Sequence, residues 1–265
     1  AMPRLLVVLA FVGCISVAKS LSPEASEIAT KHAIPYQANL RIEVIDSDIR
    51  YCAGTLISPN YVLTAANCGD GASKILVDMG VDDVENRQEP TWRTYLGDAF
   101  IAHPLYNKST GYHDIGLIHL FEPAEINDAI QLVTLPDHRY KNLAGKMARI
   151  SGWGNVNAST DLDHRLLRYA DIPIGSHSNC LPQFPYPNFA QLCPAQSDSY
   201  FQTYDFGAPL MLKDVQIGIA TATSFDNGIE TNPQIYTRVD PYLSWIMNNT
   251  DVTIEQQKDH RLAVH

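Results

Sequence analysis

The residues of this chain that could do chemistry lie around one short segment, Gln202-Thr203-Tyr204-Asp205-Phe206-Gly207-Ala208-Pro209-Leu210. The segment offers the carboxylate of Asp205, but the next residue is Phe206, and a phenyl ring has no ionisable or nucleophilic atom. No covalent acyl intermediate can therefore form on that side chain. The nine histidines of the chain, His113 among them, are scattered and show no metal-ligand spacing, so the sequence predicts neither a metal ion nor a cofactor.

This segment resembles the nucleophile segment of the chymotrypsin- and trypsin-like serine proteases, whose pattern there is Cys-x-Gly-Asp-Ser-Gly-Gly-Pro-Leu. Asp205, Gly207, Pro209 and Leu210 match that pattern, and Phe206 stands where it has the serine. The resemblance implies that the catalytic nucleophile of the family is missing from this chain.

A longer match to the same family runs from Cys52 to Cys68. It reads Cys-Ala-Gly-Thr-Leu-Ile-Ser-Pro-Asn-Tyr-Val-Leu-Thr-Ala-Ala-Asn-Cys, against Cys-Gly-Gly-Ser-Leu-Ile-Ser and Val-Leu-Thr-Ala-Ala-His-Cys in the family. Asn67 replaces the catalytic histidine. An amide has no basic nitrogen in the useful pH range, so Asn67 cannot take a proton from a nucleophile.

The segment from Ile101 to Ile118 resembles the part of the family that carries the catalytic aspartate, and Asp114 is that residue. It is the only member of the family's triad that this chain keeps. Because no imidazole remains for Asp114 to orient, we expect a structural role. In that role the amide of Asn67 donates an N–H to a carboxylate that would be costly to bury unpaired.

Further matches extend the resemblance over about residues 30–249. Ser151-Gly152-Trp153-Gly154 and Tyr236-Thr237-Arg238-Val239 match family segments, and Leu166–Ile174 resembles a strand of arthropod chymotrypsin- and collagenase-like members. The resemblance implies an all-β fold of two packed six-stranded antiparallel barrels, with the former active site in the cleft between them. The run from Asp240 is expected to begin a C-terminal helix, with Asp240 as its cap and Pro241 in its first turn.

The two ends of the chain differ from this central region. Residues 1–20 contain Arg4, an apolar run over residues 5–17 and small residues after it, which is typical of a secretory signal peptide cleaved after Ala18 or Ser20. That run is too short to cross a bilayer as a helix. We therefore expect a signal peptide at 1–20, a protease-homologue domain at 21–249, a polar extension at 250–265, and a secreted, extracellular protein.

Charge and cysteine content limit the partners and the compartment. Loss of residues 1–20 would leave 17 basic against 29 acidic residues, a net charge of −12 in place of −10, which argues against nucleic acid and anionic membranes. It would also leave four cysteines, which read as two disulfides with three possible pairings. Spacing and the resemblance both favour Cys52–Cys68 and Cys180–Cys193.

The resemblance also indicates changes around the substrate pocket. Tyr204 replaces the glycine whose backbone N–H serves the family's oxyanion hole. A third family disulfide is absent, since its positions hold Gln202 and Gly228. We expect an occluded pocket from the substitutions at its floor and walls, which are Tyr200, Phe201, Ala222, Thr223 and Gln234.

The activation apparatus of the family is missing as well. The Ile-Val-Gly-Gly amino terminus of active relatives is replaced by Pro23-Glu24-Ala25-Ser26, with no basic residue just before it for an activating protease. The usual partner of Asp205, the freed amino terminus, is therefore lost. We expect Asp205 to turn toward solvent or to find a hydroxyl, as in a zymogen-like state.

Two surface features complete the expectations. The acids Asp82, Asp83, Glu85 and Glu89 are similar to the calcium loop of some relatives, but a solvated acidic loop is favoured, because the spacing shows no cage of six to eight oxygens. Glycosylation sequons begin at Asn107, Asn157 and Asn248.

The sequence thus predicts a secreted, non-catalytic serine protease homologue that binds another protein. The resemblance implies a cofactor, decoy or regulator, as in arthropod innate immunity or at a host surface. One alternative is an extracellular structural or carbohydrate-binding protein on the same scaffold, and another is a hydrolase that uses different residues. The sequence does not name the partner.

Overall fold

The structure is a computed structural model that describes residues 26–45, 49–154, 165–180, 190–195, 205–226 and 229–253. For residues 177, 179, 222–226 and 229–234 it describes the backbone alone. The expected signal peptide, Asn157 and most of the C-terminal extension lie outside the described residues. In the part of the chain that is described, no helix is both long and apolar enough to cross a membrane.

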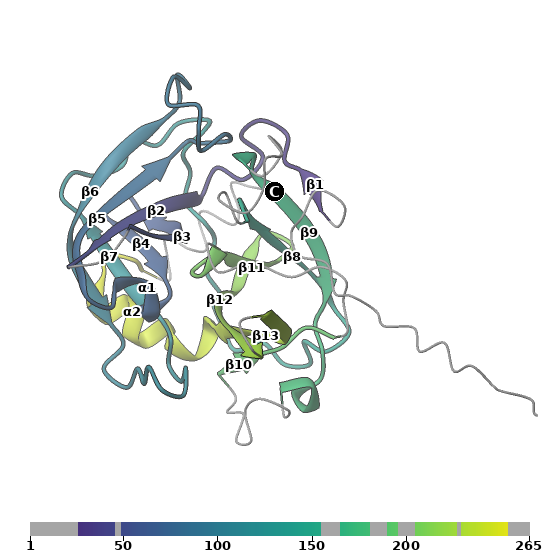
Figure 1. The fold of residues 1–265 in the computed structure, drawn as a ribbon. Coiled ribbons are helices and arrows are strands. Elements are labelled where there is room, and N and C mark those ends of the chain that lie inside the picture. The colour runs from purple at the N-terminus through teal and green to yellow at the C-terminus, as the bar shows by residue number, and fades with distance from the viewer. Residues whose placement is uncertain are drawn as a thin grey trace, which may run out of the picture.

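The first half of the chain forms a closed six-stranded barrel with the strand order β2-β3-β4-β7-β6-β5 (Figure 1). Neighbouring strands are antiparallel throughout. One short helix, α1 (Ala66–Gly69), follows the third strand. The strands are β2 (Gln37–Val44), β3 (Arg50–Ser58), β4 (Tyr61–Thr64), β5 (Ala72–Met79), β6 (Arg93–Ala102) and β7 (Gly116–Leu120).

The second half is an antiparallel sheet whose strand order in the described residues is β1-β9-β8-β11-β12-β13-β10. The all-β class and the closed first barrel are confirmed, and the second sheet has seven strands because the N-terminal β1 pairs with β9. Its strands are β1 (Glu27–Ile28), β8 (Met147–Gly152), β9 (Arg168–Pro173), β10 (Gln191–Leu192), β11 (Pro209–Leu212), β12 (Val215–Asp226) and β13 (Ile229–Arg238), and the short helix η2 (His177–Cys180) precedes β10.

Alternation of side chains explains why the barrel strands form. Leu40 and Ile42 of β2 are fully buried, while Arg41 between them and Glu43 after them are more exposed. One face of the strand therefore fills the barrel core, and the other faces outward.

The C-terminal helix packs on the first half, although it follows the second. The short helix η4 (Asp240–Tyr242) leads into α2 (Leu243–Asn249), and Ile246 of α2 lies fully buried in the barrel core. Figure 1 shows α2 crossing to the side of the barrel that carries α1. The expected helix cap is not made, because the Asp240 carboxylate instead accepts bonds from Arg238 and from the backbone N–H of Tyr140.

Both expected disulfides are confirmed. Cys52 is bonded to Cys68 inside the barrel core, and Cys180 is bonded to Cys193 beside η2. The paired cysteines are 16 and 13 residues apart in the sequence, and closure of loops of this size contributes roughly 3 kcal/mol in the chain-entropy account.

Buried polar contacts and one backbone segment join the two halves. The Thr55 hydroxyl donates to Gln216 Oε1 at 2.7 Å, from β3 of the first half to β12 of the second. At Phe206, the carbonyl accepts the N–H of Ala53 at 2.7 Å, and the next N–H, of Gly207, donates to Ala220 at 2.7 Å. The segment at 206–207 is thus bonded to a strand of each half.

Gly207 is required at this joint for two separable reasons, which a matched pair of variants can distinguish. Its φ is +89°, and an added Cβ would lie 2.0 Å from the carbonyl oxygen of Ala53. Gly145 has a similar φ of +80°, but its Cβ would have nothing within 4 Å. Backbone strain of this kind costs about 1–3 kcal/mol. We expect Gly145→Ala to lower the free energy of unfolding by about that amount. Gly207→Ala should lower it clearly more or fail to fold.

Urea unfolding of the two variants and the parent chain measures this difference. Equal losses for both variants would contradict the assigned contact between position 207 and Ala53.

Candidate functional site

The helix that carries Asn67 is held in place from both sides. It follows β4 directly, and the neighbouring Cys68 is anchored by its disulfide to Cys52. The guanidinium of Arg50 donates to the carbonyl oxygens of Asn67, Cys68 and Asp70 at 3.0, 3.1 and 2.8 Å. A cation at the end of a helix is favourable because the last carbonyls there lack partners within the helix.

Asp114 lies just before β7, with only 2% of its surface exposed. Its Oδ1 accepts the backbone N–H of Asn67 at 2.7 Å. The expected bond from the side-chain amide of Asn67 is therefore wrong in its donor, although the pairing of the two residues is right. The first N–H groups of a helix have no partner within it, so they are available to a nearby carboxylate.

Burial without a cationic partner raises the pKa of Asp114 from its ordinary 3.8 to about 7. The backbone N–H groups of Asn67 and Ala66 lower that pKa in part but do not offset the desolvation. Burial, aided by the charge of Asp114, also raises the pKa of the Tyr242 hydroxyl to about 12 and raises the pKa of the Tyr106 hydroxyl. The Asp114 carboxyl group therefore titrates near neutral pH.

Phe206 completes the trio of positions that the sequence singled out. Its ring is half-buried and packs against the hydrophobic cores of both halves. Its carbonyl oxygen lies 3.5 Å from Sγ of Cys68, the residue after Asn67. The structure therefore brings positions 67, 114 and 206 together, as the family resemblance implied, with an amide, a carboxyl and a phenyl ring as their side chains.

Asp205 does not turn toward solvent, so that part of the expectation is wrong. It is fully buried, and its Oδ1 accepts the backbone N–H groups of Trp153 and Gly154 at 3.0 and 3.1 Å. The absence of a side chain at Gly152 makes this approach possible, since a Cβ there would lie 2.0 Å from the same oxygen. Backbone donors therefore stabilise a carboxylate in a place where burial alone would be costly.

Most of the expected pocket residues lie outside the described part of the chain. Tyr200, Phe201, Gln202, Tyr204 and Gly228 belong to segments that are not described. Ala222 and Thr223 lie on β12 and Gln234 lies on β13, where the backbone alone is described. Occlusion of the pocket stays a prediction.

Carboxylates of the acidic loop around residues 82–89 accept hydrogen bonds from other groups of the protein and form ion pairs with them. Glu89 accepts the backbone N–H groups of Asp82 and Asp83 at 3.0 and 3.1 Å, and Asp83 pairs with Arg165 at 3.0 Å. Within the described residues, no three His, Cys, Asp or Glu side chains are grouped as metal ligands would be. Of the sequons, Asn107 and Asn248 are exposed, and Asn157 lies outside the described residues.

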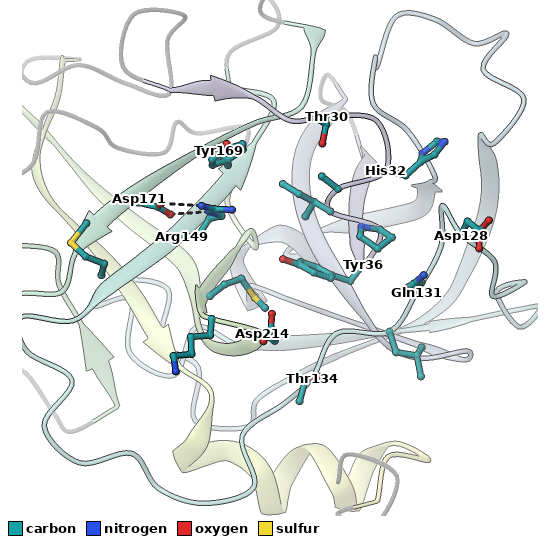
Figure 2. Close-up of a pocket in the computed structure, with 17 residues that line it drawn as sticks. Thr30, His32, Tyr36, Asp128, Gln131, Thr134, Arg149, Tyr169, Asp171 and Asp214 are labelled. Carbon is teal, nitrogen blue, oxygen red and sulfur yellow. Dashed lines mark hydrogen bonds and ion pairs between the residues drawn. The ribbon is translucent and has the colours of Figure 1, made fainter. Parts of the chain in front are cut away.

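Sequence reasoning missed a cavity of about 730 Å³ that lies between the two halves (Figure 2). Its walls include Tyr36, Arg149, Asp171 and Asp214, and none of the three triad positions lines it. These residues come from separate segments and carry no motif, so no sequence signal marks them as neighbours.

Comparison with known proteins gives consistent results. The family model described as Trypsin matches residues 26–246. Mast cell protease 3 of Ovis aries is 31% identical over 89% of this chain and 90% of its own length, and chymotrypsin of Phaedon cochleariae is 31% identical over 83% and 79%. The solved structure of GrC has a TM-score of 0.75 and 25% identity, and the match covers 86% of this chain and 99% of that one.

The raised pKa of Asp114 predicts a specific dependence of stability on pH. Between about pH 4 and pH 7 the folded chain binds this proton more tightly than the unfolded chain, so the contribution of Asp114 is fully present below pH 4 and is lost as the pH rises to 7. Asp114→Asn removes the titration. We expect the unfolding free energy of the parent chain, relative to the variant, to fall by about 1.4 kcal/mol per pKa unit of the shift across this window.

Urea unfolding of both chains at intervals from pH 4 to pH 8 makes the comparison, and the shared titration of His103 and His113 cancels in the difference. Parallel pH profiles would show that Asp114 has an ordinary pKa.

Proposed function

The chain belongs to the trypsin family, and we propose that it is a secreted, non-catalytic serine protease homologue that acts by binding another protein. The observation that carries this proposal is the assembled but chemically altered triad. Asp114 is held by the backbone of Asn67 rather than by an imidazole, and the phenyl ring of Phe206 packs on both cores. The scaffold of a protease is intact, while the general base and the nucleophile are replaced.

The replaced residues leave no evident route for acyl transfer at this site. Neither the Asn67 amide nor the Phe206 ring can accept or transfer a proton at neutral pH. Asp114 has a pKa in the useful range, but it is buried and hydrogen-bonded to a helix backbone, so it is not aimed at a substrate. Binding is the activity that such a scaffold retains.

The activation step of the family also has no evident counterpart. In the family, a freed amino terminus pairs with the aspartate at the position of Asp205. In this chain the backbone N–H groups of Trp153 and Gly154 donate to that carboxylate, and the sequence has no basic residue directly before Pro23. We therefore propose that the protein works without proteolytic activation.

Secretion and the kind of partner follow from the same features. Two disulfides are typical of proteins that fold in an oxidising compartment, and the expected signal peptide and sequons agree with that. The net charge of −10 disfavours nucleic acid and anionic membranes as partners. A cofactor, decoy or regulator that binds a component of a protease cascade, an inhibitor or a host protein fits these properties.

Affinity capture from the source fluid tests the proposed binding function. The purified chain, immobilised through its C-terminal end, should recover a protein that is identified by mass spectrometry and displaced by excess soluble chain. Recovery of glycans or matrix material in place of a protein would favour the carbohydrate-binding or structural alternative. Recovery of nothing displaceable would contradict the proposal.

Rebuilding the triad side chains should not rebuild an enzyme. In Asn67→His with Phe206→Ser, Asp114 is still present, but Tyr204 remains at the position of an oxyanion donor that is usually worth about 10²–10³ in rate. Truncation of a buried phenylalanine lowers stability by about 3–5 kcal/mol, and replacement of the half-buried Phe206 should lower it by part of that amount. We expect turnover of a mixed peptide-ester panel to stay at background.

The matched control is Asn67→His with Phe206→Leu, which keeps an apolar side chain and has no nucleophile at position 206. Turnover of the serine variant within about a hundredfold of a typical kcat of roughly 10 s⁻¹, absent from this control, would show that a working substrate site exists.

A further inference from the structure

The cavity between the two halves has walls from both halves and from the connection between them. Tyr36 comes from the segment before β2, Arg149 from β8, Asp171 from β9 and Asp214 from the turn between β11 and β12. Thr134 belongs to the chain that links the halves. Figure 2 shows the side chains of Tyr36 and Arg149 reaching toward a common space.

Tyr36 lines the cavity, and its hydroxyl forms no hydrogen bond with any of the described residues. Burial raises the pKa of this hydroxyl to about 12. The charge of Arg149 lowers that pKa and the charge of Asp214 raises it, both by smaller amounts. A hydroxyl in such a place is best satisfied by water or by a ligand that enters the cavity.

Arg149 contacts two residues of β9, yet one of its nitrogens has no acceptor among the described residues. Its Nε and Nη2 donate to the two carboxylate oxygens of Asp171 at 2.8 and 2.9 Å. Its guanidinium lies over the ring of Tyr169 at 4.2 Å, and the Tyr169 hydroxyl is bonded to Glu27. The remaining nitrogen, Nη1, donates to none of the described residues, so Arg149 offers an N–H donor in the wall of the cavity that Tyr36 also lines.

The apolar part of the wall is aliphatic. It includes Met147, which is 55% exposed, together with Leu132 and Met211. Methionine adapts to partners of varied shape. The ring of Tyr169 is already covered by Arg149, and that of Tyr36 packs into the protein cores, so neither offers a free face on which a sugar ring would stack.

We propose that this cavity binds a short extended peptide segment of neutral or basic composition that belongs to the partner protein. A main-chain carbonyl of the segment accepts hydrogen bonds from the Tyr36 hydroxyl and from Arg149 Nη1, and an aliphatic side chain packs against Met147 and Leu132. The chain's net charge of −10 disfavours an acidic segment. The inference rests on the proposed protein-binding function and assigns a surface to it.

A random heptapeptide library displayed on phage, panned against the purified full chain, is the probe. We expect enrichment of neutral or basic sequences with an aliphatic residue, whose synthetic peptides bind measurably by calorimetry. Tyr36→Phe removes one oxygen that has no hydrogen-bond partner among the described residues. It should weaken peptide binding about tenfold or more and leave the melting temperature unchanged or higher.

A matched pair of charge insertions locates the site. Met147→Glu should abolish peptide binding, because it places a carboxylate in the apolar wall. Leu96→Glu makes the same change at an exposed aliphatic residue on β6, where Leu96 is 42% exposed and does not line the cavity, and binding should persist.

Three results would overturn the inference. The first is that panning enriches no peptide. The second is that the enriched peptides bind the parent chain, Tyr36→Phe and Met147→Glu with the same affinity. The third is that a neutral oligosaccharide binds the cavity in place of a peptide and that its binding depends on Tyr36. If the partner captured from the source fluid still binds Tyr36→Phe and Met147→Glu at the parent affinity, this cavity is wrong as the site while the protein-binding function stands.

Discussion

The two backbone hydrogen bonds at Phe206 and Gly207 are the constraint on which the rest of the structure depends. One ties the segment to Ala53 of the first half, and the other ties it to Ala220 of the second. Neither bond uses a side chain, so the identity of residue 206 does not decide whether the halves are joined. A scaffold held in this way can exchange a serine for a phenylalanine and gain apolar packing at the joint.

Buried charge is handled by the same means. Asp114 and Asp205 are both buried, and both accept backbone N–H groups. In the family these carboxylates serve a histidine and a freed amino terminus, whereas here Asn67 stands at the histidine position and backbone N–H groups bind Asp205. Hydrogen bonds from backbone N–H groups offset part of the free-energy cost of burying the two carboxylates. The raised pKa of Asp114 shows that the compensation there is incomplete.

The sequence motifs predicted which positions come together at the site, whereas the hydrogen-bond donors and the cavity depend on how distant segments pack. The resemblance of two segments, Cys52 to Cys68 and Ile101 to Ile118, to the protease family implied that Asn67 lies near Asp114, and the cysteine spacing together with that resemblance favoured the correct pairing. The resemblance could not tell that the donor to Asp114 is a backbone N–H, because this depends on how a helix of four residues meets a distant loop. The orientation of Asp205 and the cavity around Tyr36 likewise arise from segments far apart in the chain, which no local pattern relates.

Reaction with an active-site-directed fluorophosphonate tests the central claim that a protease scaffold is kept without its nucleophile. The purified chain would be incubated with the reagent beside an active trypsin-family protease, and the intact mass of each would be measured. We expect complete modification of the protease and an unchanged mass for this chain. A single adduct per chain, prevented by prior unfolding and mapped to a residue near Phe206 or Asp114, would contradict the claim.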